Sequence, residues 1–216
     1  MKRSFLWIIT SLMLNIEAAS QTDCGMQQYY SMGENKSFDF TPIIYFQNSH
    51  KWTFEGRYNY EAPNTISAYA GKVYQKKSLF SYSINPVVGM VTGGFNGGSA
   101  GVNIDADFKK LSFSSQAQYS FSLEDKTQNF TYSWSELSFN LKKYVGGGLC
   151  LQQTGDYNNI NTLDRGIFLK VTSNGWTMPL YLFQNPDKEN YFILSLIYEW
   201  TQKHLIRKKN NKNNYQ

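Results

Sequence analysis

Cysteine, histidine and proline are scarce in this chain of 216 residues, which contains two, two and five of them. Two cysteines do not make a disulfide framework, and we expect Cys24 and Cys150 to be unpaired. A catalytic histidine needs a serine or an acid beside it, yet His50 falls in a predicted tight turn and His204 in the C-terminal tail. Two histidines and two cysteines this far apart also lack metal-ligand spacing. The sequence therefore predicts a protein that is not an enzyme and that needs no metal or cofactor.

Long apolar runs are missing beyond residue 20. The longest, residues 191–198, is interrupted by Ser195 and is much shorter than the ~20 residues of a membrane-spanning helix. No segment shows the periodicity of an amphipathic helix. Any membrane span in this chain must therefore consist of strands.

The N-terminus has the layout of a secretory signal peptide. Lys2 and Arg3 precede an apolar run over residues 5–16, and small residues at positions 18–20 provide a cleavage site. We therefore expect residues 1–20 to be a signal peptide that exports the chain. Residues 21–38 then form an N-terminal lead, residues 39–200 one domain and residues 201–216 a tail.

The formal net charge of +5 is concentrated in that tail. Residues 21–200 are close to neutral, at about −1, so the basic balance gives no ground for a nucleic-acid-binding surface. Lys and Asn dominate the tail, which we expect to be disordered and to lie in the periplasm. Its basic residues are Lys203, Arg207, Lys208, Lys209 and Lys212.

Residues 51–60 alternate strictly between aromatic and polar positions. A soluble β-sandwich would bury the aromatic face against a second sheet, whereas a membrane barrel turns it to lipid and encloses the polar face. Polar faces here carry Ser, Thr, Gln and Asn in place of the many Lys and Glu that water-facing strands carry, which favours the barrel. The aromatic face contains Trp52, Phe54, Gly56, Tyr58 and Tyr60, and the polar face contains Thr53, Glu55, Arg57 and Asn59.

Strand-like runs recur along the chain and are separated by polar connections. They lie at residues 40–47, 51–60, 66–75, 79–91, 99–108, 111–123, 129–140, 145–153, 165–172, 176–184 and 191–200. An even barrel with both termini on one side needs one more strand, which we place at residues 26–33. The sequence predicts an all-β fold, a single antiparallel transmembrane up-and-down β-barrel of about twelve strands. Ten strands are the alternative if residues 26–33 form none and one faint strand is misread.

Short and long connections alternate along these runs. Outer-membrane barrels have short periplasmic turns and longer external loops, so we assign the long connections to the cell exterior. Residues 154–164, which include Tyr157 and three Asn, form the longest predicted loop, and the glycine-rich residues 93–98 form another.

The alternation of apolar and polar residues changes phase within the predicted strand at residues 129–140. Phe130, Tyr132 and Trp134 alternate with Ser and Thr, whereas beyond Glu136 the apolar side chains occupy the odd-numbered positions 137, 139 and 141. We interpret this change as a β-bulge at Glu136 that keeps the apolar side chains on the lipid face.

Three tryptophans, Trp52, Trp176 and Trp200, fall at strand ends beside short turns or the C-terminus. We expect them to form an aromatic girdle at the inner, periplasmic interface of the outer membrane, in contact with its lipid. The last strand, residues 191–200, resembles the aromatic-ended terminal strand that the barrel-assembly machinery recognises. It departs from that pattern because a sixteen-residue tail follows Trp200.

Residues 57–61 (RYNYE) and 129–137 (NFTYSWSEL) carry a family resemblance. Together with the aromatic-ended last strand they resemble a family of bacterial outer-membrane β-barrels that is common in Bacteroidetes and has no assigned activity. The resemblance extends from about residue 40 to residue 200. It implies a barrel in the outer membrane of a Gram-negative bacterium and supplies no reaction or ligand.

Seven charged residues fall opposite the aromatic face, so we expect them in the lumen. Because an unpaired charge in a confined interior is costly, opposite signs should pair. One interpretation is an internal brace that holds the barrel in register, and the other is a constriction that selects small polar solutes. The seven are Glu55, Arg57, Lys72, Asp105, Glu136, Lys170 and Glu199.

Two functions remain open on the sequence alone. The first is a narrow channel or passive transporter for small polar solutes. The second is a closed barrel with a structural or interaction role through its external loops, chiefly residues 154–164. Twelve strands are compatible with both, because barrels of eight strands are filled and barrels of sixteen hold an open channel.

Overall fold

The computed structural model describes residues 23–33, 38–156, 161–184 and 190–201, and the predicted signal peptide and all but the first residue of the tail lie outside them. The described residues form thirteen β-segments and one short 3₁₀ helix. These are β1 (Asp23–Gly33), β2 (Asp39–Gln47), β3 (Trp52–Tyr58), β4 (Thr65–Lys72), β5 (Tyr74–Lys76), β6 (Phe80–Gly93), β7 (Gly97–Phe108), β8 (Leu111–Ser122), η1 (Lys126–Gln128), β9 (Phe130–Lys142), β10 (Val145–Asp156), β11 (Asn161–Ser173), β12 (Trp176–Gln184) and β13 (Tyr191–Thr201).

All the strands belong to one closed antiparallel sheet. Strands that follow each other in the sequence pair with each other, except β4 and β5, which both pair with β6. The sheet closes because β1 pairs with β13. Since β4 and β5 are one strand interrupted at Val73, the barrel has twelve strands, which confirms the predicted fold and count. The predicted extra strand at residues 26–33 lies within β1.

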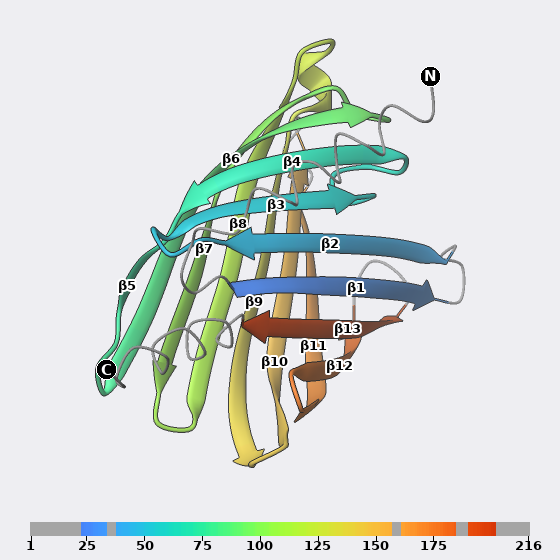
Figure 1. The fold of residues 1–216 in the computed structure, drawn as a ribbon. Helices are drawn as coiled ribbons and strands as arrows, with labels where there is room; N and C mark the ends of the chain where they lie inside the picture. The colour runs from blue at the N-terminus through green and yellow to red at the C-terminus, as the bar shows by residue number, and fades with distance from the viewer. Residues whose placement is uncertain (1–22, 34–37, 157–160, 185–189, 202–216) are drawn as a thin grey trace, which may run out of the picture.

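Strands of opposite walls cross at a steep angle. β1, β2, β3 and β13 run across the view in Figure 1, while β8 to β11 of the far wall run nearly upright. This arrangement follows from the tilt that strands must adopt to close a barrel. Short turns at 48–51, 77–79, 109–110, 143–144 and 174–175 lie at one end, here called the turn end. The opposite end, which carries the other connections, is called the loop end.

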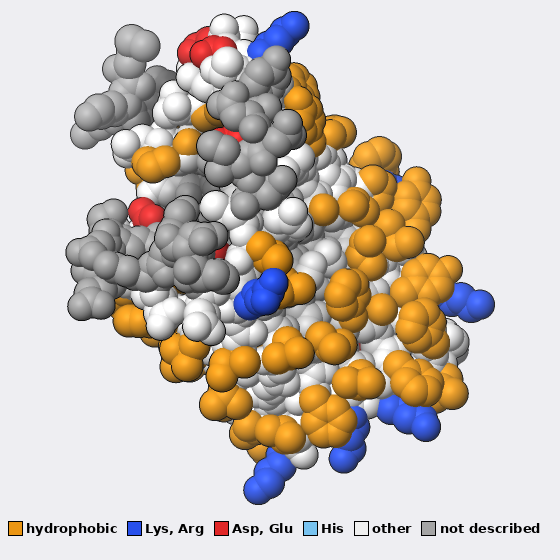
Figure 2. All heavy atoms as spheres, turned by 180° about the vertical axis from the view of Figure 1, so that it is seen from behind, with side chains coloured by type: hydrophobic (Ala, Val, Ile, Leu, Met, Phe, Trp, Pro, Cys, Tyr) orange, Lys and Arg blue, Asp and Glu red, His pale blue; other side chains and the backbone are white. Residues whose placement is uncertain are grey.

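Apolar side chains cover the outside of the barrel. Ile44, Val88, Met90, Ile167 and Leu169 are each between 57% and 78% exposed, and each follows the alternation that turns its neighbours inward. Figure 2 shows hydrophobic side chains spread over one outer face, with several Lys and Arg side chains at its lower edge. Such a belt is what a bilayer requires of a barrel wall. Among the described residues, no helix is long and apolar enough to cross a membrane.

Two loops expected to be long are largely strand. β10 continues to Asp156 and β11 begins at Asn161, so only residues 157–160 of the predicted loop 154–164 connect them, and these, with Tyr157, lie outside the described residues. The glycine-rich loop predicted at residues 93–98 is also shorter than expected, because β6 ends at Gly93 and β7 begins at Gly97. Hydrogen bonds of the sheet continue through polar residues that the sequence pattern assigned to loops.

Two predictions about the faces of strands were wrong. Asn59 has φ +55, which ends the alternation of β3, so Tyr60 turns into the barrel and does not face lipid. The register of β9 with β8 is continuous through Glu136, so no bulge lies there, and Tyr132 and Trp134 face the interior. A register shift does occur farther along the β9 and β10 pair, between Val145 and Gly146.

The loop end carries an ordered connection between β8 and β9. Asp125 caps η1 by accepting hydrogen bonds from the backbone N–H and the hydroxyl of Thr127, and these bonds lower the pKa of its carboxyl. Asn96, between β6 and β7, donates to Glu124 over 2.8 Å. The two neighbouring connections are thereby tied together outside the apolar belt.

A charge placed at the middle of the belt tests whether the belt meets lipid. Ile167 is 57% exposed at the centre of β11, and we expect Ile167→Arg to lower the free energy of unfolding in bilayers by about 2–4 kcal/mol. Leu79, 74% exposed in a short turn, is the matched control, and Leu79→Arg should cost about 0–1 kcal/mol. Guanidinium titration of both variants in lipid vesicles measures the difference. Equal costs would contradict a lipid-facing belt.

Candidate functional site

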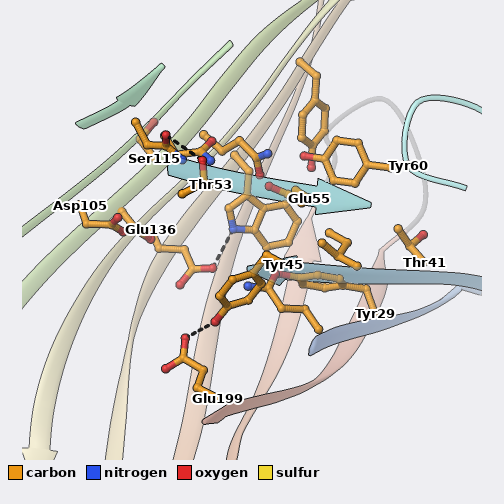
Figure 3. Close-up of a pocket in the computed structure, with 18 of the residues that line it drawn as sticks. Tyr29, Thr41, Tyr45, Thr53, Glu55, Tyr60, Asp105, Ser115, Glu136 and Glu199 are labelled. Atoms are coloured by element: carbon orange, nitrogen blue, oxygen red, sulfur yellow. Dashed lines mark hydrogen bonds between the residues drawn. The ribbon is translucent and has the colours of Figure 1, made fainter. Parts of the chain in front are cut away.

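A cavity of about 590 Å³ occupies part of the barrel interior. Its wall includes Asp23 and Gln47 at the turn end and Ser31 and Asp39 at the loop end, so it follows the whole length of β1 and β2. Figure 3 shows its lining side chains converging from β1, β2, β3 and the opposite strands. The barrel thus retains interior space that reaches both of its ends.

Packed aromatic side chains fill another part of the interior. Phe168, Tyr181 and Phe183 are each at most 3% exposed, and Trp134 packs edge-on against Tyr181 and Phe183 with ring centroids 5.1 and 5.2 Å apart. The cluster also contains Cys150 and Ile193, with Tyr29 and Tyr191 packed against it. The lumen is therefore not lined by small polar residues alone, because β9, β11 and β12 turn aromatic rings inward.

Arg57 is a buried cation with a complete set of counter-charges. It is 2% exposed, and its Nε donates to Glu55 Oε1 over 2.6 Å, while its Nη1 donates to Gln118 Oε1 over 2.9 Å and lies 4.0 Å from Glu61 Oε1. Its guanidinium also lies between two rings, 4.2 Å from the centroid of Tyr60 and 4.1 Å from that of Tyr69. Two carboxylates and two ring faces thus surround one positive charge.

This arrangement connects strands that are distant around the barrel. Arg57 and Glu55 belong to β3, Tyr69 to β4 and Gln118 to β8, and Tyr69 donates its hydroxyl hydrogen to Glu61 over 2.6 Å. The geometry is that of a brace, in which a fixed guanidinium spans the interior between opposite walls. Arg57 is absent from the wall of the cavity, so its charge does not face the open space.

Two tyrosines lie flat over glycines on the strand beside them. Tyr45 pairs with Gly25, and Tyr69 pairs with Gly89, and in both cases a Cβ on the glycine would meet the ring. The glycines therefore leave room for the rings against the wall. Tyr45 uses this position to donate its hydroxyl hydrogen to Glu199 Oε1 over 2.6 Å.

Three further carboxylates, Asp105, Glu136 and Glu199, line the cavity. Asp105 and Glu136 both lie opposite Ser114 of β8, so they stand at one level about 10 Å apart, two strand spacings. Glu136 accepts hydrogen bonds from Trp134 Nε1 at 2.7 Å and from the Tyr181 hydroxyl at 2.8 Å. All these donors, like that of Glu199, are neutral.

The two predicted lumenal lysines do not line the cavity. Lys72 was expected in the lumen, but it pairs with Trp52, its Nζ lies 4.9 Å from the ring centroid and it donates to His50 O, so it belongs to the outer face at the turn end. This position follows the alternation of β4, whose odd-numbered residues, such as Tyr69, are the buried ones. Lys170 does point inward and donates to Ser138 over 3.1 Å, but it is not part of the cavity wall.

The three tryptophans lie on the outer face near the turn end, with exposures of 47% for Trp52, 39% for Trp176 and 41% for Trp200. Trp176 packs on Tyr198 with centroids 4.4 Å apart, and Tyr198 packs on Trp200. A ring of aromatic side chains therefore exists at the level that sequence analysis indicated. Its contact with a membrane interface remains a prediction.

Several residues of the interior were missed from the sequence. Asp23 and Asp39 of the cavity wall lie in or next to the N-terminal lead, where no face could be assigned, and Glu61 of the Arg57 brace lies in a connection between two predicted strands. Trp134 and Tyr132 were assigned to lipid because they are aromatic. The available signal was their phase, since they share even-numbered positions with Glu136, a residue expected in the lumen.

Groups for catalysis or metal binding do not gather in the described part of the chain. No group of three or more His, Cys, Asp or Glu side chains there is arranged to hold a metal ion. His50 lies in a short turn at the turn end, where its Nδ1 is 3.5 Å from the Ser49 hydroxyl. Cys24 and Cys150 are free thiols.

Comparison with known proteins gives structural relatives alone, since no protein-family model and no curated protein sequence matches the chain. The KdgM porin superimposes with a TM-score of 0.60 at 12% identity, covering 81% of this chain and 98% of the porin. A structure of the KdgM porin in complex with disordered oligogalacturonate gives the same values. The NanC porin gives a TM-score of 0.54 at 8% identity and covers 81% and 98%. The chain therefore has the fold of bacterial outer-membrane porins.

Removing the central cation tests the brace. Arg57→Ala leaves Glu55 and Glu61 buried without their counter-charge, and we expect it to lower the free energy of unfolding by about 3–5 kcal/mol. Arg57→Lys keeps the charge but loses the planar group between the rings, so its loss should be intermediate. Lys72→Ala, which removes an outer cation, should cost at most about 1 kcal/mol. Urea titration in detergent measures all three, and an Arg57→Ala loss as small as that of Lys72→Ala would exclude the brace.

Proposed function

We propose that the protein is a narrow channel that lets small polar solutes cross the outer membrane passively. The observation that carries this proposal is the cavity of about 590 Å³ that follows β1 and β2 from the turn end to the loop end. A barrel with a purely structural role gains nothing from such a space, because filling it with apolar side chains would add packing energy. The polar wall instead resembles the lining of a solute path.

The chemistry of the wall suits polar solutes of limited size. Gln27, Thr41, Thr53, Asn85 and Gln116 supply hydrogen-bonding groups along the path, so a solute can exchange water for protein contacts as it moves. The aromatic cluster and the Arg57 brace occupy the rest of the interior and narrow the space that remains. The proposed channel is therefore smaller than the lumen of a sixteen-stranded porin.

The location follows from the outside of the barrel. The apolar belt, the outward tryptophans at the turn end and the closed sheet together fit an outer membrane, with its lipid as the surrounding partner. Export by residues 1–20, insertion by the barrel-assembly machinery and membership of the Bacteroidetes barrel family belong to this proposal. The tail at 201–216 would then lie in the periplasm.

The structural relatives support a transport role through their fold. One of them, the KdgM porin, is described in complex with oligogalacturonate, and such a complex is consistent with a solute path through a barrel of this architecture. An enzymatic role has no support in the cavity, because its described wall contains no histidine and the contact of Ser49 with His50 lies in a turn outside it. We therefore propose passage without chemical change.

Conductance in planar bilayers tests the proposal. The purified protein should produce discrete, reproducible current steps. Thr41→Trp places a large ring in the cavity from β2 and should lower the conductance by at least about two-fold, because the path is narrow. Ile44→Trp, on the same strand but 60% exposed on the outer face, is the matched control and should leave the steps unchanged.

Folding of each variant is checked by the faster gel mobility of an unheated barrel. Silence across voltages from a correctly folded protein would exclude the channel and favour the closed barrel that acts through its loops. Equal conductance of the Thr41→Trp and Ile44→Trp proteins would show that ions do not pass along the cavity.

A further inference from the structure

We infer that the channel selects cations and that its solutes include small organic cations with ammonium or guanidinium groups, an inference that rests on the proposed function above. The cavity wall contains six carboxylates, and among its described residues none carries a basic side chain. These carboxylates belong to Asp23, Asp39, Glu55, Asp105, Glu136 and Glu199.

Most of this negative charge is not neutralised within the described residues. The ion pairs between described residues both involve Arg57, which engages Glu55 and Glu61. Among these same residues, no basic side chain lies within ion-pair distance of Asp105, Glu136 or Glu199. The hydrogen bonds from Trp134, Tyr181 and Tyr45 fix the directions of the two glutamates without cancelling their charge.

Two buried polar atoms of the cavity wall have no hydrogen-bond partner, a hydroxyl that can donate or accept and an amide oxygen that needs a donor. Ser31 is only 8% exposed, lines the cavity at the loop end beside Asp39, and its hydroxyl has no hydrogen-bond partner. Asn103, which precedes Asp105 by two residues on the same face of β7, has a buried Oδ1 without a donor. A buried polar atom normally has a partner, so a passing solute or its water is expected to supply one.

The brace shows how this barrel already holds a cation. Arg57 is surrounded by Glu55, Glu61 and the rings of Tyr60 and Tyr69. The cavity repeats this combination of residue types, since Glu136, Asp105 and Glu199 stand together with Trp134, Tyr29 and Tyr45, but no basic side chain of the wall occupies the centre. Figure 3 shows the hydroxyl of Tyr45 directed toward Glu199. Carboxylates next to ring faces favour organic cations over anions.

The same wall argues against anionic solutes. A sugar acid would have to pass carboxylates from β1, β2, β3, β7, β9 and β13, and the described residues of the cavity wall offer it no positive side chain. In water a unit charge about 8 Å away changes the occupancy of a monovalent ion about two-fold, and several charges multiply the effect. The fold is shared with the KdgM porin, but the charge of the path is the property of this chain.

Reversal potentials in a KCl gradient test the selectivity. The wild-type channel should favour K⁺ over Cl⁻, and the ratio of permeabilities should fall about two-fold for each carboxylate neutralised in Asp105→Asn, Glu136→Gln and Glu199→Gln. The preference should be larger at 0.1 M salt, where the Debye length is about 10 Å, than at 1 M, where it is about 3 Å. Asp125→Asn, which removes a carboxylate at η1 outside the cavity and keeps a capping side chain, is the control and should leave the ratio unchanged.

Liposome swelling tests the class of solute with three compounds of similar size. L-arginine should enter faster than galactose, and galactose faster than galacturonate, and the triple carboxylate variant should reduce these differences. Gel mobility of the unheated protein confirms that each variant folds. Entry of galacturonate as fast as L-arginine, a channel that excludes L-arginine, or a potential at zero or of the anion-selective sign would overturn the inference. In each of these cases current would still flow, whereas absence of current would remove the proposed channel itself.

Discussion

Closure of the backbone hydrogen-bond ladder is the constraint on which the rest of this structure depends. In lipid an unpaired N–H or C=O has no water to bind, so a spanning sheet must have no free edge. Pairing of β1 with β13 and of β6 with both β4 and β5 satisfies this requirement. Once the sheet is closed, alternation along each strand divides the side chains into a lipid-facing set and an enclosed set.

The enclosed side chains include charged groups, and burying a charge costs free energy unless it is paired. Arg57 offsets this cost by drawing two carboxylates, two tyrosine rings and Gln118 around itself, and it becomes a brace between walls. Aromatic rings from β9, β11 and β12 fill a second region by ordinary packing. Of the carboxylates that bound the remaining space, Glu55 is paired with Arg57, whereas Asp105, Glu136 and Glu199 have no basic partner among the described residues. The brace and the cavity wall considered from the sequence are therefore largely different groups of residues that meet at Glu55 and Tyr60.

The outer face was more predictable than the inner one. Residues such as Phe54, Ile44 and Val88 follow a simple alternation because lipid imposes one uniform condition on every outward position. The interior imposes no such uniformity, since an aromatic ring with a polar handle is stable there when its hydroxyl or N–H finds a carboxylate. Trp134 is of this kind, because its Nε1 donates to Glu136, whereas Tyr60 places its ring against the Arg57 guanidinium. Hydrophobicity alone assigned both residues to lipid. The prediction for Lys72 was wrong in the opposite sense. It was expected in the lumen because it is charged, but it lies over Trp52 on the outer face.

The sequence by itself determined the all-β class, the twelve strands, the outward tryptophans at the turn end and the inward direction of Glu55, Arg57, Asp105, Glu136 and Glu199. The directions of the side chains follow from alternation within single strands, and the strand count follows from the requirement of an even barrel with both termini on one side. Neither needs knowledge of the opposite wall. Only the tertiary structure decided which of these charges are paired and which line the cavity. Pairing depends on strands that meet across the barrel, as β3 and β8 do at Arg57 and Gln118, and register along one strand carries no information about that distance.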